Sequence, residues 1–246
     1  MTSGPRRISM AGRLHTATRG ICGWRDRLAK PDTQWKRRFS AFETAMSWEL
    51  ASPTESGLPT PIEQLFHGSG FKDLTLLLAV AEHQVELDGQ GHASQCDVWA
   101  LIDTDLGKLS LTVEAKANEK FGETLEAWLS VSSETKRRNR ELRWEYLRQN
   151  LPPCDRRFLS VPYQILHRCA AAVIEAKRLK LRHAAFLVQS FSAPEKSFQA
   201  YAAFCQALGL QQARGGMSMS SVGDISLGVG WADCPFATDQ QIAAIA

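Results

Sequence analysis

Two apolar segments joined by a turn constrain the fold of this chain more than any other feature. From Leu109 to Lys116, apolar and polar residues alternate, which is the period of a strand with one buried face. Segment 96–102 is apolar and rich in β-formers apart from Asp97, and 103–108 has the composition of a turn. Strands joined so closely pair antiparallel, so the sequence predicts a β-hairpin.

The register of this hairpin brings acidic side chains together. If Ile102 faces Leu109 across the turn, Asp97 stands opposite Glu114, with Cβ atoms about 4.5–5.5 Å apart. Glu114 and Lys116 point the same way because they are two residues apart on a strand. We therefore expect two carboxylates and one ammonium group on a single face.

Such a cluster is costly by itself, because adjacent carboxylates repel and burial removes their hydration. A divalent cation removes the conflict, and magnesium prefers oxygen ligands from one or two carboxylates together with water and substrate phosphate. Lys116 would then stabilise charge that develops on a phosphate. The alternative is a surface ladder of cross-strand ion pairs between Asp97, Glu114 and Lys116.

The pattern Glu-x-Lys also occurs at 134–136 and 175–177, in segments that are expected to be helical. Residues two apart on a helix diverge by about 200°, so neither of these pairs can converge on one metal ion. Only the strand copy has the required geometry.

Composition indicates an ordinary globular chain. With 246 residues and 44% apolar content it can bury a full core, and no apolar stretch approaches the about 18 residues of a membrane span. No secretory signal is visible. The six cysteines are scattered without zinc spacing, which fits reduced thiols in a cytoplasmic protein.

The first residues are strongly basic, although the net charge is only +3. Four interpretations stay open: a nucleic-acid-binding arm, a solvated tail, a start codon placed too far upstream, or a transit peptide. We therefore divide the chain into a partly flexible basic extension over 1–34 and one domain over 35–246. Segment 118–160 is interpreted as a helical insertion in that domain.

Periodicity predicts an order of helix, three strands, helix, strand, helix, strand. Segment 74–81 is an apolar element, and a first short strand is expected around Val85 and Leu87, before a turn at 88–91. The further expected elements are helices 35–51, 161–181 and 198–208, a helix beginning over 61–66, and strands 96–102, 109–116, 184–189 and 225–231.

Two helical surfaces are candidate contacts for nucleic acid. The insertion carries the basic residues Lys136, Arg137, Arg138 and Arg140, which form either a phosphate-contacting surface or a solvated helix face. On helix 161–181, Gln164 and Arg168 lie one turn apart and share a face.

This arrangement resembles the PD-(D/E)xK nuclease-like superfamily, in which an Asp on the second strand and a Glu-x-Lys on the third precede a helix bearing Gln. The resemblance implies a mixed α/β fold with a restriction-endonuclease-like core, a central mixed sheet flanked by helices. Gln164 is similar to the Gln-x-x-x-Tyr element of the RecB-like exonuclease branch, with Arg168 where tyrosine is typical. Trp48-Glu49, Ser94 to Asp97 and other short motifs are similar to an uncharacterised bacterial family.

The resemblance assigns expected roles one residue at a time. Asp97 and Glu114 would be metal ligands for Mg²⁺ or Mn²⁺, with the Ala115 carbonyl as a third and Glu82 as an additional acid. Lys116 would be catalytic. Gln164 would position the nucleic-acid backbone or the water, unless it is simply a helix-surface glutamine.

We therefore expect a metal-dependent nuclease that hydrolyses phosphodiester bonds, with DNA as the first substrate class, by a metal-activated water. One alternative is a catalytically inactive module of the same fold that acts as an interaction or regulatory protein. Another is a nuclease directed at RNA. Fold alone does not choose between these interpretations.

Overall fold

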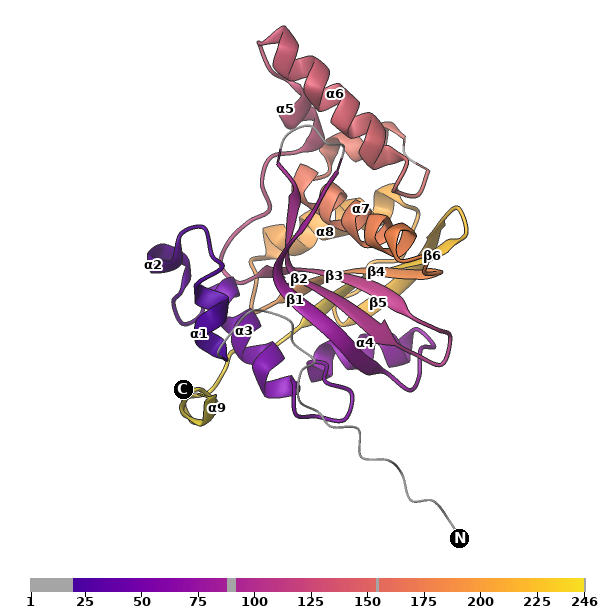
Figure 1. Cartoon of the computed structure of the whole chain (residues 1–246). Helices are drawn as coiled ribbons and strands as arrows, with labels where there is room; N and C mark the ends of the chain where they lie inside the picture. Colours follow the sequence, from indigo (N-terminus) through magenta and orange to yellow (C-terminus); the bar gives the residue numbers. More distant parts are fainter. Residues whose placement is uncertain (1–19, 88–91, 154, 246) are drawn as a thin grey trace.

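The computed structural model describes residues 20–87, 92–153 and 155–245. A six-stranded mixed sheet lies between helices on both of its faces (Figure 1), so the predicted mixed α/β class is confirmed. Residues 1–19, with most of the predicted basic extension, lie outside the described residues, as do the predicted turn 88–91 and Cys154.

The sheet has a mixed topology with the order β1-β2-β3-β4-β6-β5. Strands β1 to β3 form an antiparallel meander, β4 pairs parallel with both β3 and β6, and β5 returns antiparallel along β6. The strands are β1 (Thr75–Val85), β2 (Ser94–Asp103), β3 (Leu109–Lys116), β4 (His183–Ser190), β5 (Gly216–Val222) and β6 (Ile225–Asp233).

The predicted hairpin is present as β2 and β3. Its register pairs Ile102 with Leu109 and Val98 with Val113, which is the alignment expected from the turn. All residues of β3 are buried, because helices cover both faces of the sheet at this strand. Its polar side chains, including Glu114 and Lys116, are therefore interior groups that need partners, and a surface ladder is wrong.

Helices form the two outer layers. Helices α7 and α8 pack on one face of the sheet, and α3 and α4 on the other. Among the described residues, no helix is both long and apolar enough to cross a membrane. The helices are α1 (Ile21–Arg25), α2 (Pro31–Gln34), α3 (Ser40–Ala51), α4 (Thr60–Gly68), α5 (Leu125–Leu129), α6 (Glu134–Arg148), the 3-10 helix η1 (Arg156–Ser160), α7 (Tyr163–Arg178), α8 (Glu195–Ala207) and α9 (Asp239–Ile245).

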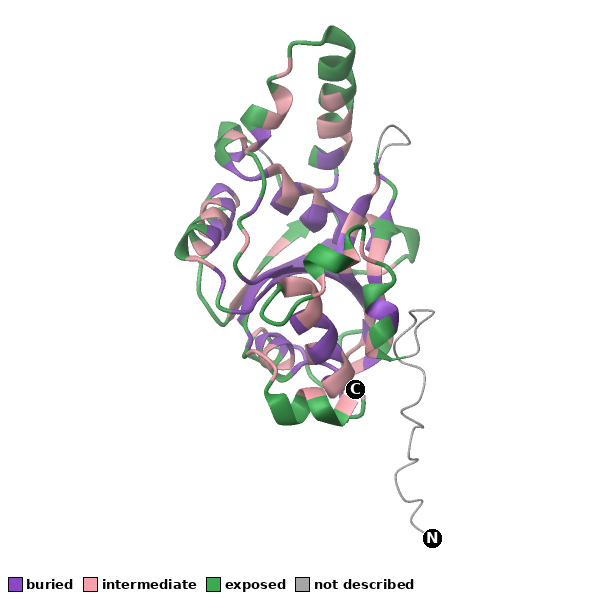
Figure 2. Ribbon diagram, turned by 90° about the vertical axis from the view of Figure 1, so that its left-hand side faces the viewer, coloured by how far each residue is buried: buried purple, intermediate pink, exposed green. Residues whose placement is uncertain are grey.

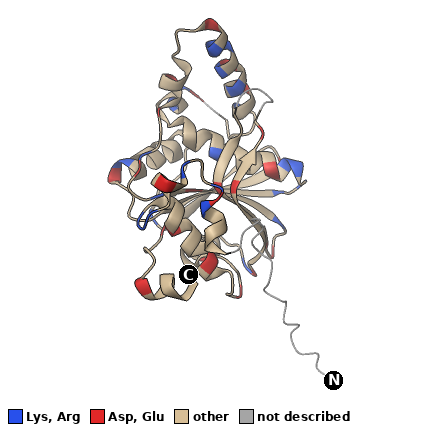
Figure 3. Cartoon of the chain, turned by 60° about the vertical axis from the view of Figure 1, so that its left-hand side comes forward, with Lys and Arg blue, Asp and Glu red and all other residues tan. Residues whose placement is uncertain are grey.

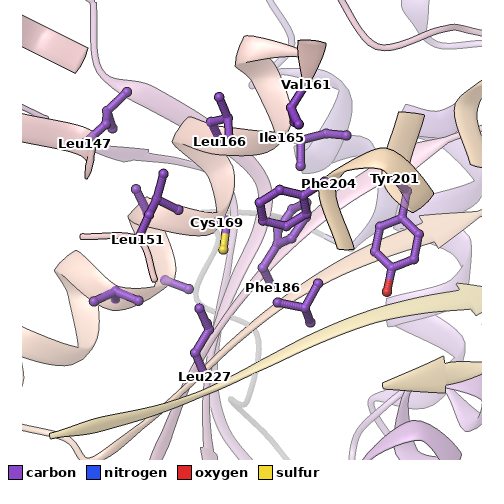
Figure 4. Packing of buried hydrophobic residues seen from close by; sticks show 14 of the residues in the cluster. Leu147, Leu151, Val161, Ile165, Leu166, Cys169, Phe186, Tyr201, Phe204 and Leu227 are labelled. Carbon is purple, nitrogen blue, oxygen red and sulfur yellow. The ribbon is translucent and has the colours of Figure 1, made fainter. Parts of the chain in front are cut away.

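The larger core cluster lies between the sheet and helices α7 and α8 (Figure 4). Cys169 and Ala172 are fully buried on α7, and such small side chains let the helix approach the strands closely. Phe186 from β4 meets Phe204 from α8 edge to face, with ring centroids 6.2 Å apart. This packing holds α7, which carries Gln164 and Arg168, over β3.

Three sequence-based expectations about elements were incomplete. Segment 74–81 and the expected short strand around Val85 are one long strand, β1. The expected helix 35–51 begins only at Ser40. Trp24 is buried in the core and donates to Glu49, so the folded part of the chain begins before residue 35.

Strand β5 was missed because its sequence is rich in Ser and Met and its side chains are mostly partly exposed, as suits a sheet edge. Its partner β6 needs glycine for close packing. A Cβ at Gly228 would lie 2.7 Å from Met217 Sδ, and one at Gly230 would lie 2.6 Å from Leu187 Cδ2.

Replacing Phe186 with alanine should destabilise the fold by about 3–5 kcal/mol, because the change opens a cavity at the centre of the larger core cluster. Chemical denaturation measures the difference in free energy of unfolding. Leu142→Ala, at a side chain that is 53% exposed, is the control and should change stability by less than about 0.5 kcal/mol. Equal effects of the two substitutions would contradict a central position of Phe186 in the core.

Candidate active site

Three carboxylates lie in a row across three neighbouring strands. The β1–β2 register pairs Ala81 with Val98 and His83 with Cys96, which sets Glu82 beside Asp97. The β2–β3 register continues from Val98 and Val113 to Asp97 and Glu114. Glu82, Asp97 and Glu114 therefore come from β1, β2 and β3 at one end of the meander.

Glu114 is the most fully neutralised of the three. Its Oε1 accepts from Lys116 Nζ at 2.7 Å and from Gln164 Nε2 at 2.6 Å, while Oε2 accepts from Arg168 Nε at 2.7 Å. Burial favours a raised pKa, but the charges of Lys116 and Arg168 outweigh it and lower the pKa of Glu114 to about 2. Glu114 is therefore ionised at neutral pH, and α7 is tied to β3 by charged hydrogen bonds.

Asp97 is held differently. Its Oδ2 accepts the backbone N–H of Ala115 at 2.6 Å, so the side chain takes the place of a strand-pairing acceptor where the β2–β3 ladder ends. Burial raises its pKa well above the ordinary aspartate value, and the charges of Glu114 and Glu82 raise it further. Asp97 is thus a half-buried carboxylate that lies beside two other carboxylates.

Glu82 combines strain with incomplete neutralisation. Its φ of 53° places a non-glycine residue in the left-handed region within a strand, at a cost of about 1–3 kcal/mol. Gln95 Nε2 donates to its Oε2 at 2.6 Å, and burial raises its pKa to about 7. Backbone strain at a carboxylate of this kind is typical of functional sites.

These residues line one open cavity of about 340 Å³. Four carboxylates and two cationic side chains border it, an excess of two negative charges when all are ionised. Figure 3 marks the acidic and basic residues of the described chain on the ribbon, in red and blue. The side chains are those of Gln34, Ser40, Glu82, Gln95, Asp97, Glu114, Lys116, Glu119, Gln164 and Arg168.

The donor set fits the expected metal ligands in part. The hydrogen bonds described for Asp97 and Glu82 engage one oxygen of each, so the second oxygen is available, and oxygen donors suit magnesium. Glu114 would bind a cation only by giving up Lys116, Gln164 or Arg168. In the described part of the chain, no three His, Cys, Asp or Glu side chains converge as a ready ligand set. The residues fit a hard cation best at Asp97 and Glu82.

Arg168 is fixed from several sides. Besides Glu114, its Nη1 donates to Ser94 Oγ at 2.9 Å, and Ser94 Oγ lies 2.8 Å from His167 Nδ1. Burial and the nearby guanidinium lower the pKa of His167 well below its ordinary value, so this imidazole is neutral. Arg168 is only 9% exposed and therefore belongs to the interior of the site, where the sequence had suggested a nucleic-acid contact.

The other basic residues that were predicted to contact nucleic acid lie on α6, away from the carboxylates in the sequence. Lys136, Arg137 and Arg138 are exposed on its first turns (Figure 2), which project from the body of the domain. The base of this arm is anchored near the site, because the Trp128 ring stacks on Tyr163 with centroids 3.8 Å apart and Tyr163 precedes Gln164.

Sequence reasoning missed several polar groups of the cavity, among them Gln95, Glu119 and Ser40. Gln95 binds Glu82, and Glu119 accepts from the Ala117 N–H at 3.1 Å and also contacts the hydroxyl of Ser40. Glu119 lies three residues after Lys116, which is a signal that could have suggested it. Gln95 and Ser40 carry no such signal, because their partners are distant in the sequence or on another strand.

The comparisons with known proteins add a family. A family model described as "Domain of unknown function (DUF6946)" matches residues 17–235, a range that includes every residue of the candidate site. No curated protein and no solved structure matches the chain.

Glu82→Gln should make the protein more stable than the wild type at pH 8. Because folding raises the pKa of Glu82 from 4.5 to about 7, the folded state binds more protons, and stability falls as pH rises through this window. Removing the charge should recover on the order of 2 kcal/mol at pH 8 and nothing at pH 4.5. Denaturation curves at several pH values measure this difference.

The control for this experiment is Glu86→Gln, an exposed glutamate just after β1. Added Mg²⁺ should stabilise the wild type at pH 8 more than the Glu82→Gln variant, a readout that needs no catalytic activity. Parallel stability–pH curves for the wild type and Glu82→Gln would contradict a raised pKa at Glu82.

Proposed function

The chain belongs to the family of domains of unknown function DUF6946, and we propose from its site that it is a metal-dependent nuclease. The reaction would be hydrolysis of phosphodiester bonds in nucleic acid, with DNA as the first substrate class, on a restriction-endonuclease-like core of the PD-(D/E)xK type. One observation carries the proposal: Glu82, Asp97 and Glu114 line one open cavity together with Lys116.

A divalent cation would be held by Asp97 and Glu82, with Glu114 and the Ala115 carbonyl as the remaining candidates. When bound, Mg²⁺ or Mn²⁺ would supply Lewis-acid polarisation of a phosphate and lower the pKa of water. The observation that favours a cation is electrostatic, because Asp97 and Glu82 both have a raised pKa in an environment with excess negative charge.

The chain's own cationic groups would act on the substrate. Burial favours a lowered pKa for Lys116, but Glu114 and Asp97 outweigh it and raise the pKa, so the ammonium is charged at neutral pH. It borders the cavity and could move from Glu114 to an oxygen of the scissile phosphate, where developing charge needs a donor. Gln164 could donate its amide N–H to the same phosphate group, since it also borders the cavity.

A non-catalytic module of the same fold is the second candidate. The observation in its favour is the complete engagement of Glu114 by Lys116, Gln164 and Arg168, which resembles a structural ion-pair network. A purely structural network does not account for the strained backbone of Glu82 or for the raised pKa of Asp97. We therefore favour catalysis.

Helix α6 would contribute contacts to the nucleic-acid backbone. Its exposed run of Lys136, Arg137 and Arg138 lies on a helix in which only Leu147 is buried. Phosphate contacts of this type supply affinity without reading the sequence of bases. A cytoplasmic location fits the proposal, because Cys96, Cys169, Cys205 and Cys234 are buried as free thiols.

Lys116→Met should reduce hydrolysis by about 10²-fold or more, because the change removes a donor to the reacting phosphate. The assay uses linear, circular and single-stranded DNA and RNA with Mg²⁺ or Mn²⁺, and with EDTA. Glu114 is a poorer test residue, since its removal would leave buried Arg168 and Lys116 without their partner.

The matched control is Lys177→Met, in the helical Glu-Ala-Lys copy on α7, where the ammonium donates to Asn150 Oδ1 at 2.8 Å. This variant should cleave like the wild type. Absence of hydrolysis by the wild type on every substrate would favour the non-catalytic module.

Replacing Lys136, Arg137 and Arg138 together with glutamine should weaken DNA binding and flatten its salt dependence. The slope of log K against log salt should fall by about 0.9 for each phosphate that the variant no longer neutralises. Fluorescence anisotropy at several salt concentrations measures the slope. The control triple variant changes exposed Lys108, Lys180 and Arg182, which lie at the opposite end of β3 and β4 from Lys116. An unchanged slope in the α6 variant would show that this helix does not contact the DNA phosphates.

A further inference from the structure

A second hollow lies next to the carboxylate cavity. It has a volume of about 420 Å³ and shares Gln34, Ser40 and Glu119 with that cavity. These shared residues place the second hollow, a groove at the start of α3, beside the carboxylates. We call it the α2–α3 groove, and its outer part is completed by Thr33, Phe39, Ala41 and Asn118.

An aromatic ring lines the outer part of this groove. Phe39 is 42% exposed, whereas burial of a phenylalanine side chain is normally favourable by about 1.5–3 kcal/mol. Its position is fixed by the backbone around it, because the N–H of Arg38 donates to Glu43 Oε1 at 2.7 Å and the Arg38 carbonyl accepts from Asn118 Nδ2 at 3.3 Å. The backbone that carries the ring is therefore fixed at the groove.

A basic residue lies directly beside this ring. Lys36 Nζ lies 5.8 Å from the centroid of Phe39. Arg37 pairs with Asp239 at 2.7 Å, and the Arg38 guanidinium lies over the Phe236 ring. Arg38 itself follows a left-handed backbone, with φ of 64°, which turns the chain into α3. An exposed aromatic ring beside a cation is a combination by which proteins hold single-stranded nucleic acid, since the ring stacks on a base and the cation meets a phosphate.

We infer that the α2–α3 groove binds a single-stranded stretch of the nucleic acid next to the phosphate under attack, with Phe39 stacking on a base. The inference rests on the proposed nuclease function, because the groove lies beside the carboxylates. An unpaired strand is required, since a base in a duplex is stacked on its neighbours and offers no free face. Lys36 meets the phosphate beside the stacked base.

Binding of a fluorescent oligothymidylate tests the inference, measured by anisotropy in the Lys116→Met background so that no cleavage occurs. Adding Phe39→Ala should weaken binding about 5-fold or more, because loss of one stacked base has an effect of this size. Phe39→Trp should bind at least as tightly as the parent. Leu106→Ala, at a 55% exposed side chain that borders neither hollow, is the control and should bind as the parent does.

Two results would overturn the inference: unchanged oligothymidylate binding by the Phe39→Ala variant, or an equal loss of affinity for a blunt duplex. Hydrolysis of a small chromogenic phosphodiester separates this failure from that of the proposed function, because so small a substrate does not reach the groove. On an otherwise wild-type chain, Leu106→Ala should leave that hydrolysis unchanged, whereas Lys116→Met should reduce it. Oligothymidylate binding that depends on Phe39, without hydrolysis of any substrate, would support the groove and reject the nuclease.

Discussion

The contact between Glu114 on β3 and Arg168 on α7 joins the fold to the site. Glu114 is 2% exposed and accepts hydrogen bonds from Lys116, Gln164 and Arg168, so it stays ionised inside the protein. A buried carboxylate of this kind is stable only while a cationic partner remains, because a buried charge without a counterion is costly. The position of α7 over the sheet, and with it the shape of the cavity, depends on this contact.

The two neighbouring carboxylates have pKa values that are shifted in the opposite direction from that of Glu114. Glu114 is satisfied by the protein, whereas Asp97 and Glu82 have a raised pKa because burial and mutual repulsion are not offset. Titratable groups whose environments move their pKa values apart are characteristic of sites that bind ions or transfer protons. The same row of strands thus holds one structural carboxylate and two that can accept a cation.

The hairpin and its register could be predicted because the short turn at 103–108 fixes which residues of the two strands face each other. Strand β5 could not, since an edge strand rich in serine carries little hydrophobic signal. In the site, the positions of Asp97 and Glu114 on their strands could be predicted from the sequence. The contacts of Arg168 were not, because 54 residues separate it from Glu114 and only packing of α7 on the sheet joins them.

The chemistry of Glu82 argues that this end of the sheet is not shaped by stability alone. A glutamine at this position would keep an acceptor for Gln95 without the raised pKa, and glycine would adopt the left-handed backbone at no steric cost. The glutamate at this position has both the raised pKa and the strained backbone, and it lies beside another incompletely neutralised carboxylate, Asp97. In the proposed function, a bound cation would offset the charge, and a phosphodiester brought to that cation would complete its ligands. The strained acid, the open cavity and the groove at Phe39 would then have one common explanation in a polyanionic substrate.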